Sequence, residues 1–169
     1  MKNKLLLVRP SYAGRLPILE RVLPEDGVKQ GIYTKEVLGS CSSLHVIRSD
    51  GQQYLLAEEG RESPVRVGRY GIIDGPGFTF FIEPLFQKSK GLLYLDEIGL
   101  LHLSAPRFQA LVCDYLASPN PLLAVISEED HPFLNAVRDD PRVMVWHFDL
   151  HVRGLLEERI KEWVQRMME

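Results

Sequence analysis

The sequence has few cysteines and no long run of apolar residues. Cys41 and Cys113 are the only two cysteines among 169 residues, and they are not clustered. In a chain that shows no export signal, two separate cysteines predict reduced thiols rather than a disulfide framework or a metal site. The apolar run at residues 5–8 is too short for the core of a signal peptide or for a membrane span. We therefore expect a cytoplasmic protein with no membrane segment.

Positive charge is also scarce relative to negative charge. The chain has 20 Lys and Arg residues against 23 Asp and Glu residues, which gives a net charge of −3. Domains that bind nucleic acids are usually basic, so the composition contains no signal for such a partner. The histidines lack the spacing of a zinc site; they are His45, His102, His131, His147 and His151. With 45% hydrophobic and 25% charged residues, the composition instead predicts one globular domain over residues 1–169.

The most informative stretch is residues 91–99, where an unbroken apolar run leads into Asp96, Glu97 and, shortly after, a glycine. Such a run predicts a strand that is buried on both faces and ends at the edge of a sheet. In an open α/β sheet, ligands bind beyond the carboxyl ends of the strands, so the two acids lie where a phosphate, a metal ion or a catalytic water would be handled. The pattern also fits a buried strand that ends at two solvated acids, and this stretch alone leaves both interpretations open.

The remaining chain predicts an α/β fold. Further buried strands are expected at residues 5–8, 122–126 and 142–146, and helices at 18–23, 106–116, 132–137 and 155–167. Because strands alternate with helices in the second half, we expect a mostly parallel sheet with helices on both faces. Between residues 31 and 70, short β-like runs around a turn at Asp50 and Gly51 predict an antiparallel hairpin insertion.

Four segments carry a family resemblance. They are residues 28–37, the glycine–tyrosine motif at 67–71, the strand at 95–99 and the stretch 132–143. In this order and spacing they resemble the small P-loop nucleoside-triphosphatase family that includes the cancer-related nucleoside triphosphatase and its thermophilic prokaryotic relatives. The resemblance covers nearly the whole chain and implies a three-layer P-loop NTPase-like fold.

The resemblance also implies an activity, which is slow hydrolysis of nucleoside triphosphates such as ATP or GTP with Mg²⁺. In P-loop NTPases, the Asp of the Walker B strand holds Mg²⁺, and a further residue orients the attacking water. This resemblance implies that Asp96 binds the metal ion and that Glu97 is the catalytic residue that orients the water. Arg153 falls near a basic position that follows the last strand of the family, which makes it a candidate contact for the nucleotide.

The phosphate loop departs from the family pattern. A working loop reads G-x-x-x-x-G-K-[ST], because its glycines permit close backbone approach, its Lys reaches the phosphates and its hydroxyl binds Mg²⁺. When the chain is aligned on the end of its first strand, these four positions hold Arg9, Gly14, Arg15 and Leu16. Leu16 cannot bind Mg²⁺, and Pro17 removes a backbone N–H from the first helical turn. We therefore predict a degenerate Walker A loop with weak or absent catalysis.

Three functional hypotheses follow from these residues. In the first, Arg9, Gly14 and Arg15 still bind a phosphate or another anion, and the protein is a nucleotide-binding or regulatory member of the family. A solvated basic end would explain the same charges. In the second, the protein is a slow Mg²⁺-dependent nucleoside triphosphatase in which Arg15 replaces the Lys. In the third, it binds no nucleotide and docks a protein partner through residues 31–57 or through the last helix.

Overall fold

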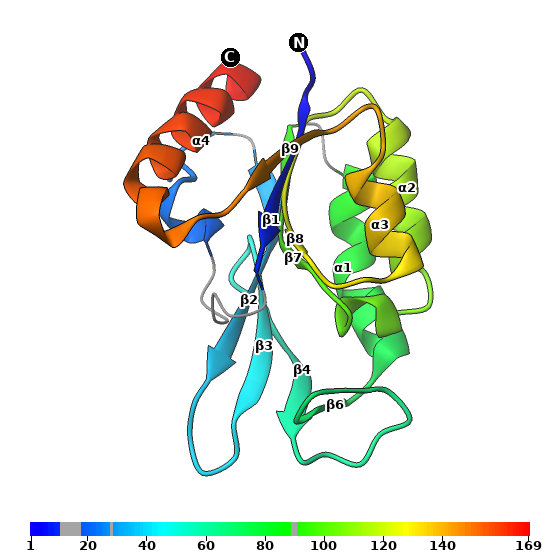
Figure 1. The fold of residues 1–169 in the computed structure, drawn as a ribbon. Helices are drawn as coiled ribbons and strands as arrows, with labels where there is room; N and C mark the ends of the chain where they lie inside the picture. Colours follow the sequence, from blue (N-terminus) through cyan, green and yellow to red (C-terminus); the bar gives the residue numbers. More distant parts are fainter. Residues whose placement is uncertain (11–17, 28, 89–90) are drawn as a thin grey trace.

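The computed structural model describes residues 1–10, 18–27, 29–88 and 91–169. Within these ranges the chain forms one nine-stranded sheet, and helices lie on both faces of its parallel strands (Figure 1). The strands are β1 (Lys4–Arg9), β2 (Lys29–Val37), β3 (Ser43–Arg48), β4 (Gln53–Glu59), β5 (Arg66–Val67), β6 (Tyr70–Ile72), β7 (Leu92–Ile98), β8 (Leu122–Ser127) and β9 (Met144–His147). The α-helices are α1 (Gly75–Lys88), α2 (Phe108–Ala117), α3 (Pro132–Arg138) and α4 (Arg153–Met168), and 3-10 helices lie at Leu19–Arg21, His102–Ser104 and Leu150–Val152.

One half of the sheet is parallel. Its strands lie in the order β2-β7-β8-β1-β9, and each pairs in parallel with its neighbours. β1 and β7 are buried at every position, because helices or helical turns cover both of their faces. This confirms the predicted α/β fold with a mostly parallel core, and it brings the carboxyl ends of these strands to one edge of the sheet.

The other half of the sheet is antiparallel and continues in the order β3-β4-β6-β5. The expected turn is present, since Gly51 has a φ of +86° and its N–H donates to the Arg48 carbonyl at 2.8 Å. The boundary differs from the expected insertion at residues 31–70. β2 belongs to both halves, because it pairs in parallel with β7 and antiparallel with β3, and the antiparallel pairing extends to Ile72. The hydrophobic pattern of one strand does not show which other strands pair with its two edges.

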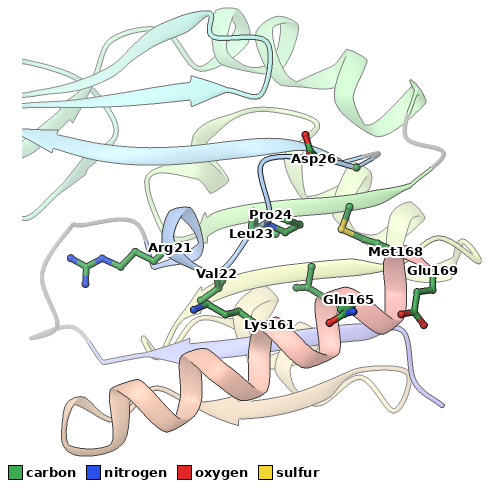
Figure 2. A pocket seen from close by; sticks show the side chains of 11 residues that line it. Arg21, Val22, Leu23, Pro24, Asp26, Lys161, Gln165, Met168 and Glu169 are labelled. Carbon is green, nitrogen blue, oxygen red and sulfur yellow. The ribbon is translucent and has the colours of Figure 1, made fainter.

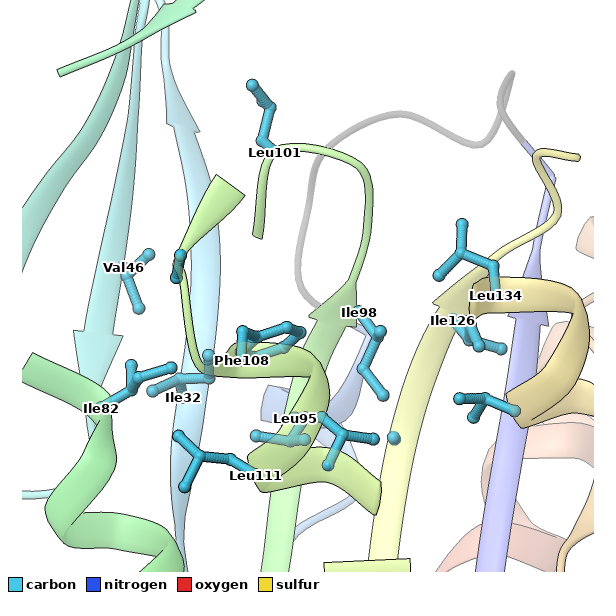
Figure 3. Packing of buried hydrophobic residues seen from close by; sticks show 14 of the residues in the cluster. Ile32, Val46, Ile82, Leu95, Ile98, Leu101, Phe108, Leu111, Ile126 and Leu134 are labelled. Atoms are coloured by element: carbon cyan, nitrogen blue, oxygen red, sulfur yellow. The ribbon is translucent and has the colours of Figure 1, made fainter. Parts of the chain in front are cut away.

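The two faces of the sheet carry separate hydrophobic clusters. α1, α2 and α3 cover one face, and α4 with the 3-10 helix Leu19–Arg21 covers the other. Alternate residues of each strand supply the two clusters; in β1, Leu6 points to the first and Leu7 to the second. Figure 3 shows part of the first cluster, with Leu95 and Ile98 of β7 close to Phe108 of α2. The sheet is therefore the middle of three layers.

Two helical expectations need correction. The helix expected at residues 18–23 is only a 3-10 turn, Leu19–Arg21, which is followed closely by Pro24. The last helix matches its expected span, and Leu156, Ile160 and Trp163 are buried on the sheet as its apolar stripe predicts. Leu155, however, is 66% exposed, because it lies beside that stripe and not within it. No helix in the described ranges is both long enough and apolar enough to cross a membrane.

Candidate functional site

Arg9, Asp96 and Glu97 meet at the carboxyl edge of the parallel strands. Arg9 is the last residue of β1, and the two acids lie near the end of β7, with β8 between the two strands. Strands are spaced by about 4.8 Å, so only a long side chain reaches from β1 to β7. Arg9 shares its side of β1 with Leu5 and Leu7, which pack under α4. The alternation along each strand thus points Arg9 and Asp96 to the same face of the sheet.

The guanidinium of Arg9 lies against both carboxylates. Its Nη2 is 3.7 Å from Oδ1 of Asp96, and its Nη1 is 3.8 Å from Oε2 of Glu97. All three side chains are buried, with exposed fractions of 6% for Arg9, 1% for Asp96 and 7% for Glu97. The interpretation in which the strand ends at two solvated acids is therefore wrong.

Asp96 connects β7 to the 3-10 turn Leu19–Arg21. Its Oδ2 accepts a hydrogen bond of 2.9 Å from the backbone N–H of Leu19, and its Oδ1 has no hydrogen bond within the described part of the chain. Burial raises the pKa of Asp96 to about 7, although the charge of Arg9 and the Leu19 N–H both favour the ionised form. The carboxyl group can therefore change its charge near neutral pH.

His102 supports the backbone just beyond the acid pair. Its Nδ1 accepts a hydrogen bond of 3.2 Å from the Gly99 N–H, so that nitrogen carries no proton. The proton is on Nε2, which donates to Oγ1 of Thr34 at 2.9 Å. The imidazole is 1% exposed. Sequence reasoning considered His102 only as a metal ligand and missed this contact, because nothing in the sequence indicates that Thr34 is a neighbour.

The other candidate residues are not part of this cluster as the structure describes it. Gly14 and Arg15 lie outside the described residues, so their roles remain predictions. Arg153 begins α4, is 40% exposed and bonds through Nε to Oε1 of Glu157 at 2.9 Å. The start of α4 lies toward the same end of the sheet as the end of β1 (Figure 1). Among the described residues, no ion pair or hydrogen bond joins Arg153 to either acid, and its role also remains a prediction.

The metal-binding capacity of the cluster is limited. In the ranges that the structure describes, no group of three or more His, Cys, Asp or Glu side chains is placed to hold a metal ion. Mg²⁺ prefers octahedral oxygen coordination and usually retains several waters, which requires an open, wet site. Asp96 and Glu97 are instead buried and already lie within 4 Å of a cation, Arg9. These residues do not fit Mg²⁺ in this arrangement.

On the face covered by α4, the described residues line hollows at two places. One, of about 430 Å³, is lined by Glu20, Lys29, Ser49 and the stacked rings of Tyr33 and Tyr94, whose centroids are 4.9 Å apart. Burial raises the pKa of both tyrosines. Tyr33 pairs with Asp96 in the β2–β7 ladder, but Arg9, Asp96 and Glu97 do not line this hollow.

The second hollow, of about 560 Å³, lies between the segment 21–27 and the end of α4 (Figure 2). Its apolar walls include Val22, Pro24 and Met168, and Lys161 and Glu169 supply charges. Figure 2 shows Met168 and Glu169 at the end of α4, away from the carboxyl end of β1. Neither acid of the β7 pair lines this hollow, so it is separate from the Arg9 cluster.

The fold and the cluster define an α/β protein of the P-loop NTPase type. A family model described as NTPase matches residues 17–161. The chain therefore belongs to this NTPase family, and the resemblance seen in its sequence motifs is confirmed.

Proteins of similar sequence support the family assignment. The chain is 28% identical over 148 residues to nucleoside-triphosphatase THEP1 of Thermotoga sp. (strain RQ2), covering 84% of this chain and 82% of that protein. It is 27% identical over 156 residues to THEP1 of Hyperthermus butylicus, covering 88% and 82%.

Two solved structures share the fold. The crystal structure of THEP1 from Aquifex aeolicus superposes with a TM-score of 0.80 at 21% identity, over 96% of this chain and 99% of that one. The solution structure of a human cancer-related nucleoside triphosphatase gives 0.78 at 23% identity, over 99% and 100%. At these identities the likeness establishes the three-layer fold and not the activity.

Proposed function

We propose that this chain is a cytoplasmic nucleoside-triphosphate-binding protein with a degenerate Walker A loop, and that it hydrolyses its ligand slowly or not at all. The observation that carries the proposal is the cluster of Arg9, Asp96 and Glu97 at the carboxyl edge of β1 and β7. This edge is where proteins with open parallel sheets bind phosphates. The names of the relatives, which are nucleoside triphosphatases, support a nucleotide as the ligand.

The burial of Glu97 and its contact with Arg9 support weak hydrolysis. A residue that orients an attacking water needs a carboxylate that faces solvent or bound water. The Glu97 side chain is only 7% exposed, and one of its oxygens lies 3.8 Å from Arg9. Leu16 and Pro17 add to this effect, because the loop lacks a hydroxyl ligand and one backbone donor.

The proposal is tested by calorimetric titration of the folded protein with ATP and with GTP, with phosphate release measured in the same samples. We expect heat of binding and little or no release of phosphate. The absence of binding at millimolar nucleotide, from protein shown to be folded by circular dichroism, would refute the proposal.

An active, slow triphosphatase is the second candidate, and the retained acid pair favours it. In this mechanism Arg15 would replace the Lys of the loop, Asp96 would hold Mg²⁺ in an arrangement that differs from its described contact with Arg9, and Glu97 would position the water. Mg²⁺-dependent turnover that is abolished in E97Q would select this candidate over the first. Turnover that is unchanged in D96N would exclude this mechanism.

Exposed apolar side chains favour the third candidate, a protein-interaction module. Val37 and Leu38 at the turn after β2 are 50% and 73% exposed, and Leu155 on α4 is 66% exposed. Contiguous exposed apolar surface marks interaction sites, and Val37 and Leu38 are adjacent in the chain. A stable complex that is recovered on pull-down with the wild-type protein and lost in L38S would select this candidate, provided that calorimetry detects no nucleotide binding.

A further inference from the structure

We propose that Arg9 takes the place of Mg²⁺ as the cation of the Asp96–Glu97 pair, so that this site excludes divalent metal and binds a phosphate ligand without it. The identity of the phosphate ligand in this proposal rests on the proposed function above. The exclusion of metal is independent of that function, because it concerns only three residues that the structure describes.

The geometry of the guanidinium supports this assignment. A guanidinium carries its N–H donors in a planar fork, so it can face two acids at once. In Arg9, Nη2 faces Asp96 and Nη1 faces Glu97, at 3.7 and 3.8 Å. One guanidinium thus lies between the two acids. A Mg²⁺ ion bound to the same pair would lie beside this guanidinium in a buried site, which repulsion between the two cations disfavours.

The backbone holds Arg9 in this position. Arg9 pairs with Ser127 at the end of the β1–β8 ladder, and its carbonyl accepts a hydrogen bond of 3.2 Å from the Glu128 N–H. The side chain therefore starts from a hydrogen-bonded strand. A Walker A loop begins with glycine at the aligned position, which leaves that space free of side-chain atoms. In this chain the same space contains a cation that cannot diffuse away.

Burial of the acids supports the same conclusion. The side chains of Asp96 and Glu97 are 1% and 7% exposed, so little room remains for the waters that Mg²⁺ retains. Oδ1 of Asp96 has no hydrogen bond in the described residues, and its described ionic neighbour is Arg9. Both carboxylates thus face the guanidinium of Arg9.

The first test measures metal binding by the protein without nucleotide. Mn²⁺ is the probe, because it accepts the same oxygen ligands as Mg²⁺ and its free form is quantified by electron paramagnetic resonance. We expect no binding to the wild-type protein up to about 1 mM Mn²⁺, and binding at least about tenfold tighter in R9G. Adding D96N to R9G should remove that site. R142A is the matched control, because Arg142 pairs with Asp140 away from the cluster, and it should behave as wild type.

If R9G does not fold, Mn²⁺ binding to the wild-type protein and to D96N still tests whether Arg9 excludes metal. Submillimolar Mn²⁺ binding to the wild type that is lost in D96N would overturn the proposal, because the acids would then accept metal with Arg9 in place. A folded R9G that gains no Mn²⁺ site would also overturn it.

The second test measures ATP binding in EDTA and in excess Mg²⁺. We expect the two affinities of the wild type to agree within about threefold, and R9G to lose affinity in EDTA. A strengthening of about tenfold or more by Mg²⁺ in the wild type would contradict the proposal. If the wild type binds no ATP under either condition, the proposed function fails, whereas the Mn²⁺ measurement still decides whether Arg9 excludes metal.

Discussion

The backbone N–H of Leu19 donates a hydrogen bond of 2.9 Å to Oδ2 of Asp96, which lies 77 positions later in the chain. This contact ties β7 to the 3-10 turn Leu19–Arg21. One buried carboxylate thereby faces both Leu19 and Arg9. Changes at Asp96 are therefore expected to affect stability as well as ligand binding.

The stability of the protein should depend on the titration of Asp96. Its pKa is raised to about 7 by burial, against about 3.9 in an unfolded chain, so the folded state binds more protons between pH 4 and pH 7. The free energy of unfolding should therefore fall as pH rises through this window, by up to about 1.4 kcal/mol per pH unit from this group. Urea unfolding at pH 5, 6, 7 and 8 should show a flatter dependence in D96N.

D140N is the control for this measurement. Hydrogen bonds from Arg142 lower the pKa of Asp140 in the folded state. Asp140 therefore adds to the free energy of unfolding above its unfolded pKa, and this contribution is lost as the pH falls from the unfolded pKa through the folded one. D140N should therefore change the pH dependence only at acidic pH. An identical pH dependence in D96N and wild type between pH 5 and 8 would show that Asp96 does not titrate there.

Removing Arg9 should strongly destabilise the fold. R9M leaves two buried carboxylates without their described cation, and breaking a buried ion pair in this way typically costs about 3 kcal/mol. The triple variant R9M/D96N/E97Q should recover much of this loss, because no buried charge is then left uncompensated. Urea unfolding at pH 8 measures both values. If R9M matches the surface control R142A, the ion pair makes no contribution to stability.

Replacement of His102 should also destabilise the protein. H102A removes the acceptor of the Gly99 N–H and the donor to Thr34, and it leaves a cavity between Phe78 and Phe108. We expect a loss of about 3 kcal/mol, and a loss of about 1 kcal/mol in T34V, where only one hydrogen bond is removed. His151 has an exposed side chain, so H151A should stay within about 0.5 kcal/mol of wild type. Equal stabilities of H102A and H151A would contradict the assigned contact.

Gly31 and Gly154 should respond in opposite directions to substitution by alanine. A Cβ at Gly31 would overlap the carbonyl oxygen and the ring of Tyr94, whereas nothing lies within 4 Å of a Cβ at Gly154 in α4. We expect G31A to lose about 2 kcal/mol through strain at the β2–β7 pairing. G154A should gain up to about 1 kcal/mol from helix propensity. Thermal unfolding of the two variants compares them directly.

The sequence determined the architecture because hydrophobic periodicity is a local property. Unbroken apolar runs identified β1, β7 and β8 as doubly buried strands, and the spacing of Leu156, Ile160 and Trp163 identified the buried face of α4. The order of several motifs was enough to recognise the family. The two acids on β7 could also be selected from sequence, because carboxyl ends of parallel strands are where ligands bind.

Only the tertiary structure decided how those acids are used. Their burial, the contact of both with Arg9 and the hydrogen bond from Leu19 to Asp96 join residues that are 77 or more positions apart. The same holds for the bond between His102 and Thr34, and for the double role of β2 in the sheet. Pairing of distant strands depends on the free energy of the whole fold. A local stretch of sequence gives the properties of its own residues and not the residues that they will contact. For that reason Arg9 was a phosphate-binding candidate in the sequence, and it is the cation that accompanies Asp96 and Glu97 in the folded protein.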